Sequence, residues 1–323
     1  MQKTLSKMRP DIMSVTKEKT KKNAYFNKKA KALTILASPA ILLVFIFNYI
    51  PMFGLTLAFK NYRYDLGILK SPWIGFSNFV YFFTSQDAWR VTRNTIGYNA
   101  VFIALVIIGS VFVAIILNEV TSTRLVKAYQ TIFFFPYFLS WPVVAILLYA
   151  FLNTDMGLVN KLIQFFGNDG VNWYSTPNAW IYIMPILNLW KNIGYNIIVF
   201  YAGLIAIDPT YYESARIDGA SRLQMIFKIT LPLLSPLITI LLLVMLGKIF
   251  NADFGQFFIA TKDTGALYPT TDVIDTYVYR TLRVTGNIGM ASAVGLFQSV
   301  LGLITVLLSN WAIRAINSDN ALF

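Results

Sequence analysis

Long runs of apolar residues recur along the chain, and most of them contain no charged side chain. A membrane-spanning helix needs about 20 mostly apolar residues, and six segments reach that length. The strands of a membrane β-barrel alternate apolar and polar positions over about 10 residues, whereas these runs are continuous. The pattern therefore predicts an all-α polytopic membrane protein with six transmembrane helices, at residues 33–59, 94–118, 128–154, 179–207, 229–250 and 284–313.

Composition supports a membrane protein and removes several classes of enzyme. Hydrophobic residues make up 56% of the chain and charged residues 13%, against about 25% charged residues in an average soluble domain. The chain contains no cysteine and no histidine. This excludes disulfides, thiolate or imidazole metal ligands and histidine-based catalysis. We therefore predict no catalytic residue and no metal site.

The distribution of basic residues predicts the orientation in the membrane. Lysine and arginine concentrate on the cytoplasmic side, and the first 32 residues contain ten of the 27 basic residues. Because an even number of spans puts both termini on one side, we expect both to be cytoplasmic. Residues 1–32 are predicted to form a basic tail that contacts water or anionic lipid rather than nucleic acid, and residues 33–323 to form the transmembrane domain.

Four of the predicted spans contain proline. Proline removes a backbone hydrogen bond and bends a helix, and membrane bundles tolerate this where neighbouring groups satisfy the freed carbonyls. We expect kinks near Pro39, Pro51, Pro136, Pro142, Pro185 and Pro236.

The loop at residues 208–232 is too polar to cross a membrane and too patterned to be a plain linker. Asp208 followed by Pro209 is typical of a helix start, with the carboxylate as cap and proline in the first turn. We expect a short helix that ends near Ile217, because Gly219 accepts the left-handed conformation. A second short helix should follow and present Leu223, Ile226, Phe227 and Thr230 at helical spacing.

This loop resembles the EAA loop of bacterial ABC importer permeases. The family pattern is Glu-Ala-Ala, a short spacer, Asp-Gly-Ala, a longer spacer and Ile-x-Leu-Pro, and this chain departs from it only at Ser214. Serine is nearly as small as alanine, so docking should be preserved. The resemblance implies that the loop contacts an ATP-binding subunit through Glu213, Ser214, Ala215, Asp218, Gly219, Ala220, Leu231 and Pro232.

Further segments resemble one subgroup of the carbohydrate-uptake permeases, which serve oligosaccharides and polysaccharide fragments in Gram-positive bacteria. These segments are residues 190–196, 271–280 and 320–323. The resemblance implies a bacterial cell-membrane protein that works as a heterodimer with a second permease subunit. It also implies two cytosolic ATP-binding subunits and an extracytoplasmic solute-binding lipoprotein.

The chain contains no phosphate-binding loop of the G-x-x-x-x-G-K-[ST] type. Its only Gly-Lys pair, Gly247-Lys248, lies in a predicted span and is followed by Ile249. We therefore expect no cofactor on this chain and ATP with Mg²⁺ on the partner subunits, so that energy arrives through a protein contact.

Two lysines inside the spans mark the candidate substrate path, since intramembrane charges are costly and usually functional. Lys191 and Lys248 each lie 17 residues from the cytoplasmic end of their span, roughly 25 Å at the rise of an α-helix. Amide and hydroxyl groups and an aromatic ring, which suit a sugar, accompany them. The alternative is a polar stripe that packs against the partner permease. The candidate path comprises Asn188, Lys191, Asn192, Tyr195, Lys248, Asn251 and Gln256.

The two lysines also bear on the charge of the substrate. No acid inside the predicted helices lies at their depth, although Asp253 is close enough in sequence to pair with Lys248. An unpaired lysine would favour an acidic, uronate-containing oligosaccharide, whereas paired lysines leave a neutral one open. Two other functions remain as alternatives: a membrane-embedded glycan or lipid transferase, and an assembly subunit.

We predict that Gly219→Leu and Glu213→Lys each abolish uptake while the chain still inserts into the membrane. The bulky side chain should clash with an ATP-binding subunit, and the reversed charge should repel it. Substrate-stimulated ATP hydrolysis by the assembled transporter measures coupling, and immunoblots of membranes measure insertion. Normal stimulated hydrolysis in both variants would refute the docking role of the loop.

Overall fold

The computed structural model describes residues 29–316 and divides the chain into two compact units, Met1–Thr56 and Leu57–Phe323. Most of the predicted basic tail, residues 1–28, lies outside the described residues, and so does the resembling segment 320–323. Residues 29–32, the end of that predicted tail, already belong to the first helix. Of the predicted 33–323 domain, residues 33–56 belong to the first unit.

Four helices are long and apolar enough to cross a membrane as single elements: Lys29–Phe59, Gln86–Asn118 (α4), Arg222–Leu246 and Ile288–Ala315, the last within α14 (Ile288–Ile316). They overlap the first, second, fifth and sixth predicted spans. Residues 29–316 contain no strand, only an isolated bridge between Lys60 and Trp73. The all-α prediction is therefore confirmed for the described chain.

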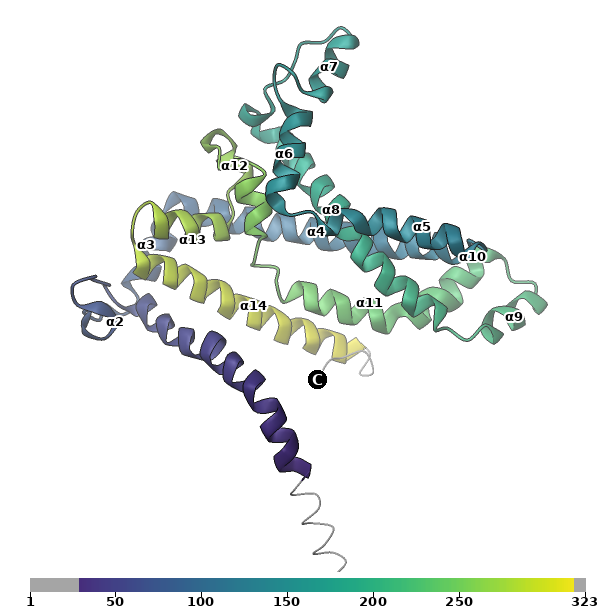
Figure 1. Cartoon of the computed structure of the whole chain (residues 1–323), viewed down its shortest axis with the longest axis horizontal. Helices are drawn as coiled ribbons and strands as arrows, with labels where there is room; N and C mark the ends of the chain where they lie inside the picture. Colours follow the sequence, from purple (N-terminus) through teal and green to yellow (C-terminus); the bar gives the residue numbers. More distant parts are fainter. Residues whose placement is uncertain (1–28, 317–323) are drawn as a thin grey trace, which may run out of the picture. The chain divides into compact units, whose positions relative to one another are not determined.

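The third predicted span, residues 128–154, is not one helix. It consists of α5 (Thr123–Phe134), the 3-10 turn η3 (Phe135–Phe138) and α6 (Trp141–Leu152), with a bend of 99° between the halves (Figure 1). Two prolines explain the break, because neither Pro136 nor Pro142 can donate the backbone hydrogen bond that would continue a helix. Pro142 instead occupies the first turn of α6, where that donor is not needed.

The fourth predicted span corresponds to α8 (Pro177–Ile205), which is followed after a 68° bend by the short helix α9 (Thr210–Ile217). Pro185 lies inside α8 and Pro236 inside α11 (Leu231–Leu246). By length and composition, the described residues thus provide four spans, or six if each bent pair counts as one. The count of six and the orientation of the termini stay predictions.

Helix α8 is central to the second unit because it packs against α4 over much of its length. Tyr98 of α4 and Trp180 and Met184 of α8 form one buried cluster, and Phe200 and Leu204 of α8 belong to another. Short elements cover one end of these long helices or connect them: α2 (Gly67–Lys70), α3 (Ser77–Thr84), α7 (Leu158–Phe165), η4 (Trp173–Ser175), η6 (Gly255–Ile259), η7 (Gly265–Leu267), α12 (Tyr268–Thr271) and α13 (Ile274–Arg283).

A glycine permits the close approach of α8 to the end of α5. A Cβ placed on Gly194 would lie 2.1 Å from the carbonyl oxygen of Phe133, far inside van der Waals contact. The obstacle is backbone, which cannot rotate away as a side chain can. Small residues at such crossings are what allow membrane helices to pack closely.

We predict that Gly194→Ala lowers the free energy of unfolding by about 1–3 kcal/mol, the usual effect of overpacking a close contact. Gly295→Ala in α14 is the matched control, because a Cβ there meets nothing within 4 Å. Thermal unfolding of both variants in detergent checks the prediction. Equal melting temperatures for the two variants would contradict the assigned contact.

Candidate coupling surface and translocation path

The loop after α8 begins with the predicted helix cap. Asp208 Oδ1 accepts hydrogen bonds from the backbone N–H of Thr210 at 2.9 Å and from its hydroxyl at 2.8 Å. These bonds, the backbone one first, lower the pKa of the Asp208 carboxyl because they favour its charged form. Helix α9 then runs to Ile217, where the sequence predicts its end.

Gly219 ends α9 in the left-handed conformation, with φ of +76°. The N–H of Ala220 donates to the carbonyl of Ala215 at 2.9 Å, and the N–H of Gly219 donates to that of Arg216 at 3.1 Å. This pair of bonds is the Schellman arrangement, which requires a positive φ at the residue after the cap. The predicted role of Gly219 in the backbone is confirmed.

The second short helix of the loop is not a separate element. Ser221 and Gln224 form a capping box at the start of α10 (Arg222–Met225), which continues through the π-helical turn η5 (Ile226–Thr230) into α11. The Tyr212 hydroxyl of α9 lies 3.0 Å from the hydroxyl of Thr230, which is buried. Helix α9 is therefore attached directly to the base of a continuous helix, Arg222–Leu246.

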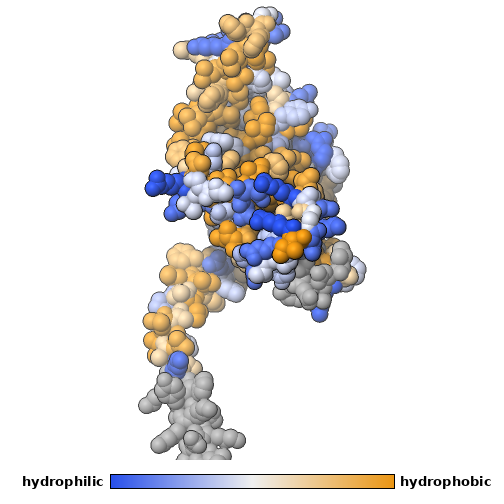
Figure 2. Space-filling model, turned by 90° about the vertical axis from the view of Figure 1, so that its right-hand side faces the viewer, coloured by the Kyte–Doolittle hydropathy of each residue, from blue (hydrophilic) through white to orange (hydrophobic). Residues whose placement is uncertain are grey.

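The predicted coupling residues form an accessible surface around α9. Glu213, Ser214, Asp218 and Gly219 are exposed. Hydrophilic side chains gather at this end of the molecule, where α9 and α10 lie (Figure 2). Of the remaining predicted coupling residues, Ala215, Ala220 and Leu231 are half-buried, and Pro232 is exposed. Docking of an ATP-binding subunit on any of these residues stays a prediction.

Lys191 lies at the break in the third span rather than on an open surface. Its ammonium donates to the carbonyl oxygens of Pro136 at 3.4 Å and Tyr137 at 3.3 Å. A third bond goes to the carbonyl of Leu139. The ammonium also lies 5.2 Å from the ring of Trp141, and the residue is 7% exposed. Three acceptors match the three N–H donors of an ammonium, so these contacts favour a role in positioning the break.

The amides of the predicted path are paired inside the chain. Asn188 donates to the side-chain carbonyl of Gln256 at 2.9 Å, and Gln256 donates to the backbone carbonyl of Met184 at 2.9 Å. Both amides are buried, so they attach η6 to α8. Asn192 is half-buried and donates to the carbonyl of Asn188 at 3.1 Å. Tyr195 is exposed and stacks on a tyrosine of η3.

Lys248 and Asn251 are the predicted polar groups of this path that remain exposed beyond the end of α11. Within residues 29–316, the Lys248 ammonium has no hydrogen-bond or ion-pair partner. The suggested pairing with Asp253 is wrong. The Asp253 carboxylate accepts from the Trp141 indole N–H at 2.8 Å and from the N–H of Gly255 at 2.9 Å.

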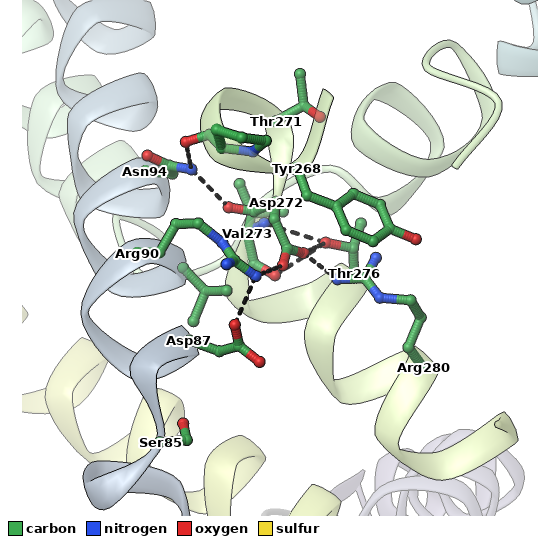
Figure 3. Close-up of polar contacts among 12 residues, drawn as sticks. Ser85, Asp87, Arg90, Asn94, Tyr268, Thr271, Asp272, Val273, Thr276 and Arg280 are labelled. Atoms are coloured by element: carbon green, nitrogen blue, oxygen red, sulfur yellow. Dashed lines mark hydrogen bonds and ion pairs between the residues drawn. The ribbon is translucent and has the colours of Figure 1, made fainter. Parts of the chain in front are cut away.

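A buried charge cluster that the sequence did not reveal lies where α4, α12 and α13 meet (Figure 3). The Asp272 side chain is fully buried and accepts from Arg90 of α4 at 2.9 Å and from Arg280 of α13. The hydroxyl of Thr276 donates to the same carboxylate at 2.9 Å. We call this group the Asp272 clamp.

Further bonds extend the Asp272 clamp to the neighbouring turns. Arg280 also pairs with Asp263 at 3.0 Å, and the Tyr268 hydroxyl donates to Asp263 at 3.0 Å. Asn94 donates to the backbone carbonyl of Asp272 at 2.9 Å. The carboxylates of the clamp are thus neutralised by arginines. Among residues 29–316, no group of three acids is placed to hold a metal ion.

A second buried carboxylate, Asp275, holds the break after α11. It accepts from the backbone N–H of Ala252 at 2.7 Å and from Gln298 of α14 at 3.1 Å. Burial raises the pKa of the Asp275 carboxyl, although these two hydrogen bonds oppose the shift. Asp275 therefore fixes the backbone just beyond Lys248 against α13 and α14.

Comparisons with known proteins agree with this architecture. Residues 107–318 match the protein family described as binding-protein-dependent transport system inner membrane component. The polygalacturonan/rhamnogalacturonan transport system permease protein YteP of Bacillus subtilis is 32% identical over 95% of this chain and 96% of its own. Protein LplB of the same organism is 32% identical over 90% of this chain and 91% of its own.

Two solved structures share the fold. The crystal structure of a bacterial ABC transporter that imports the acidic polysaccharide alginate matches 90% of this chain and 97% of its own, with a TM-score of 0.82 and 36% identity. The same kind of transporter, in complex with a periplasmic protein carrying an alginate pentasaccharide, matches with a TM-score of 0.81 and 35% identity. The chain belongs to the family of binding-protein-dependent transport system inner membrane components and is a permease subunit of an ABC importer.

Proposed function

We propose that this chain forms half of the translocation path of an ATP-driven importer for acidic, uronate-containing oligosaccharides. The observation that carries the substrate class is the exposed Lys248 ammonium, which lies at the end of a span and has no counter-ion among the described residues. The relatives support the same class, since alginate is an acidic polysaccharide and polygalacturonan is a polymer of a uronic acid.

Lys248 is better placed than Lys191 to recognise a negative charge on the substrate. The ammonium of Lys191 has three backbone carbonyls as partners, so its charge is already stabilised within the chain. The ammonium of Lys248 is free to make a charge-assisted hydrogen bond, which is stronger than a neutral one. Asn251 is exposed close by in the sequence and offers an amide to a sugar hydroxyl.

The exposed residues around α9 support the assembly that we propose. A second permease subunit completes the path, and two ATP-binding subunits contact the exposed residues around α9. Both termini then lie in the cytoplasm, with the Asp272 clamp on the opposite side. An extracytoplasmic solute-binding lipoprotein delivers the oligosaccharide there, as the complex with a periplasmic protein suggests for the related transporter.

We predict that Lys248→Gln reduces the preference for acidic over neutral oligosaccharides by roughly tenfold or more, the usual effect of losing a hydrogen bond to a charged group. Substrate-stimulated ATP hydrolysis by the reconstituted importer, measured with acidic and neutral oligosaccharides of equal length, checks this. Lys161→Gln is the control, because Lys161 is exposed on α7. A wild type that responds only to neutral sugars would refute the proposed substrate, and an unchanged preference in Lys248→Gln would refute the role of Lys248.

We predict that Asp272→Asn lowers the free energy of unfolding by about 1.5–3 kcal/mol, the usual worth of a hydrogen bond to a charged group, because Arg90 keeps its pair with Asp87 and Arg280 its pair with Asp263. If the Asp272 clamp supports the face that receives the binding protein, the variant should also need more binding protein to reach half-maximal ATP hydrolysis. Asp155→Asn is the control, since Asp155 is exposed between α6 and α7. Unchanged stability and unchanged half-saturation would show that the clamp is dispensable.

A further inference from the structure

A groove of about 920 Å³ runs between α4 and α8, and none of the predicted path residues lines it. Most of its lining is apolar, from Val101 and Leu105 of α4 and from Ile181, Tyr182 and Ile186 of α8. Only a few polar groups line the groove, among them Arg93 of α4 and Asn178 of α8. The groove is thus amphipathic, with a basic group and a long apolar wall.

The shape of the groove suits a single extended chain. Gly97, Val101 and Leu105 follow one another at a spacing of four on α4, so they lie along one face. A Cβ on Gly97 would meet nothing within 4 Å, so the absent side chain leaves the groove open. From Arg93 to Leu105 the helix rises roughly 18 Å, about the thickness of the hydrocarbon of one membrane leaflet.

Arg93 lies where the charge-free run of α4 begins. It directly precedes the charge-free run 94–118 of α4, so its guanidinium lies at the boundary of the apolar segment. Its Nη2 donates to Asn94 Oδ1 at 3.0 Å and to the carbonyl of Pro269 at 3.3 Å. These bonds hold the guanidinium in place but leave N–H donors unused, since arginine carries five.

The lack of a carboxylate partner distinguishes Arg93 from Arg90. Arg90, one helical turn earlier, pairs with both Asp87 and Asp272. Within residues 29–316, Arg93 forms no ion pair with a carboxylate. An arginine that is held in place and lacks a carboxylate partner can bind a phosphate through two parallel hydrogen bonds. An apolar helix from a partner subunit would bring no anion to Arg93.

We propose that the groove between α4 and α8 binds one anionic phospholipid, with its phosphate on Arg93 and an acyl chain along Gly97, Val101 and Leu105. The headgroup chemistry is a phosphodiester with a net negative charge, as in phosphatidylglycerol. The inference concerns the groove between α4 and α8 and does not depend on the identity of the transported oligosaccharide.

The test uses the assembled transporter in nanodiscs that contain phosphatidylcholine and phosphatidylglycerol in equal parts. Native mass spectrometry after detergent extraction counts the phospholipids that each complex retains. We expect Arg93→Gln to retain phosphatidylglycerol roughly tenfold less well at this site, the effect expected from losing a hydrogen bond to a charged group. Arg283→Gln is the matched control, because Arg283 is exposed on α13 outside the groove. Equal retention in the wild type and Arg93→Gln would overturn the proposal.

A second variant separates loss of the site from loss of folding. Gly97→Phe should fill the groove beside Arg93 and leave the arginine charge in place, so it should lose the same phospholipid while the transporter stays assembled. Because the chain contains no cysteine, Gly97→Cys also provides a unique cross-linking position. A cross-link to a lipid-borne probe supports the proposal, whereas an efficient cross-link to a partner subunit would assign the groove to a protein interface and overturn it.

Discussion

The requirement that every backbone carbonyl find a donor inside the membrane constrains this structure most strongly. Hydrocarbon offers no hydrogen bonds, so a broken span is tolerated only where the protein itself satisfies the freed groups. The third apolar segment turns by 99°, and the Lys191 ammonium bonds three carbonyls at the break. One turn later on α8, Gly194 lets the helix approach the backbone at Phe133 closely enough for this contact.

The two ends of the second unit are held by different physical means. At the α9 end, backbone capping and the Tyr212–Thr230 contact shape a surface whose charged side chains remain exposed. At the other end, the fully buried carboxylate of Asp272 joins arginines from α4 and α13. A buried charge network tolerates few alternative arrangements, because any shift exposes an unpaired charge. The end that holds Asp272 is therefore the more tightly constrained, and the α9 end is the more accessible.

Features that depend on neighbouring residues could be predicted from the sequence. The apolar runs predicted the positions of four single helices, and Asp208 and Gly219 predicted both ends of α9, because capping uses groups within a few residues. The break near Pro136 could not be predicted, since two prolines are equally compatible with a gentle kink. The Asp272 clamp was missed because Arg90 is 182 residues away from its partner. The hydrogen bond between Asn188 and Gln256 could not be predicted either, because the two residues are 68 positions apart in the sequence.

The continuous helix Arg222–Leu246 gives the chain a mechanical element. Its 25 residues span roughly 37 Å, from the capping box at Ser221 to the turn that carries Lys248. The part beyond η5, α11 (Leu231–Leu246), acts as the lever, since a small tilt at its base displaces the turn that carries Lys248. The π-helical turn η5 near the base widens the helix by one residue and is the natural flexure point. Tilting of α11 about η5 would therefore displace the exposed Lys248 ammonium just beyond its far end.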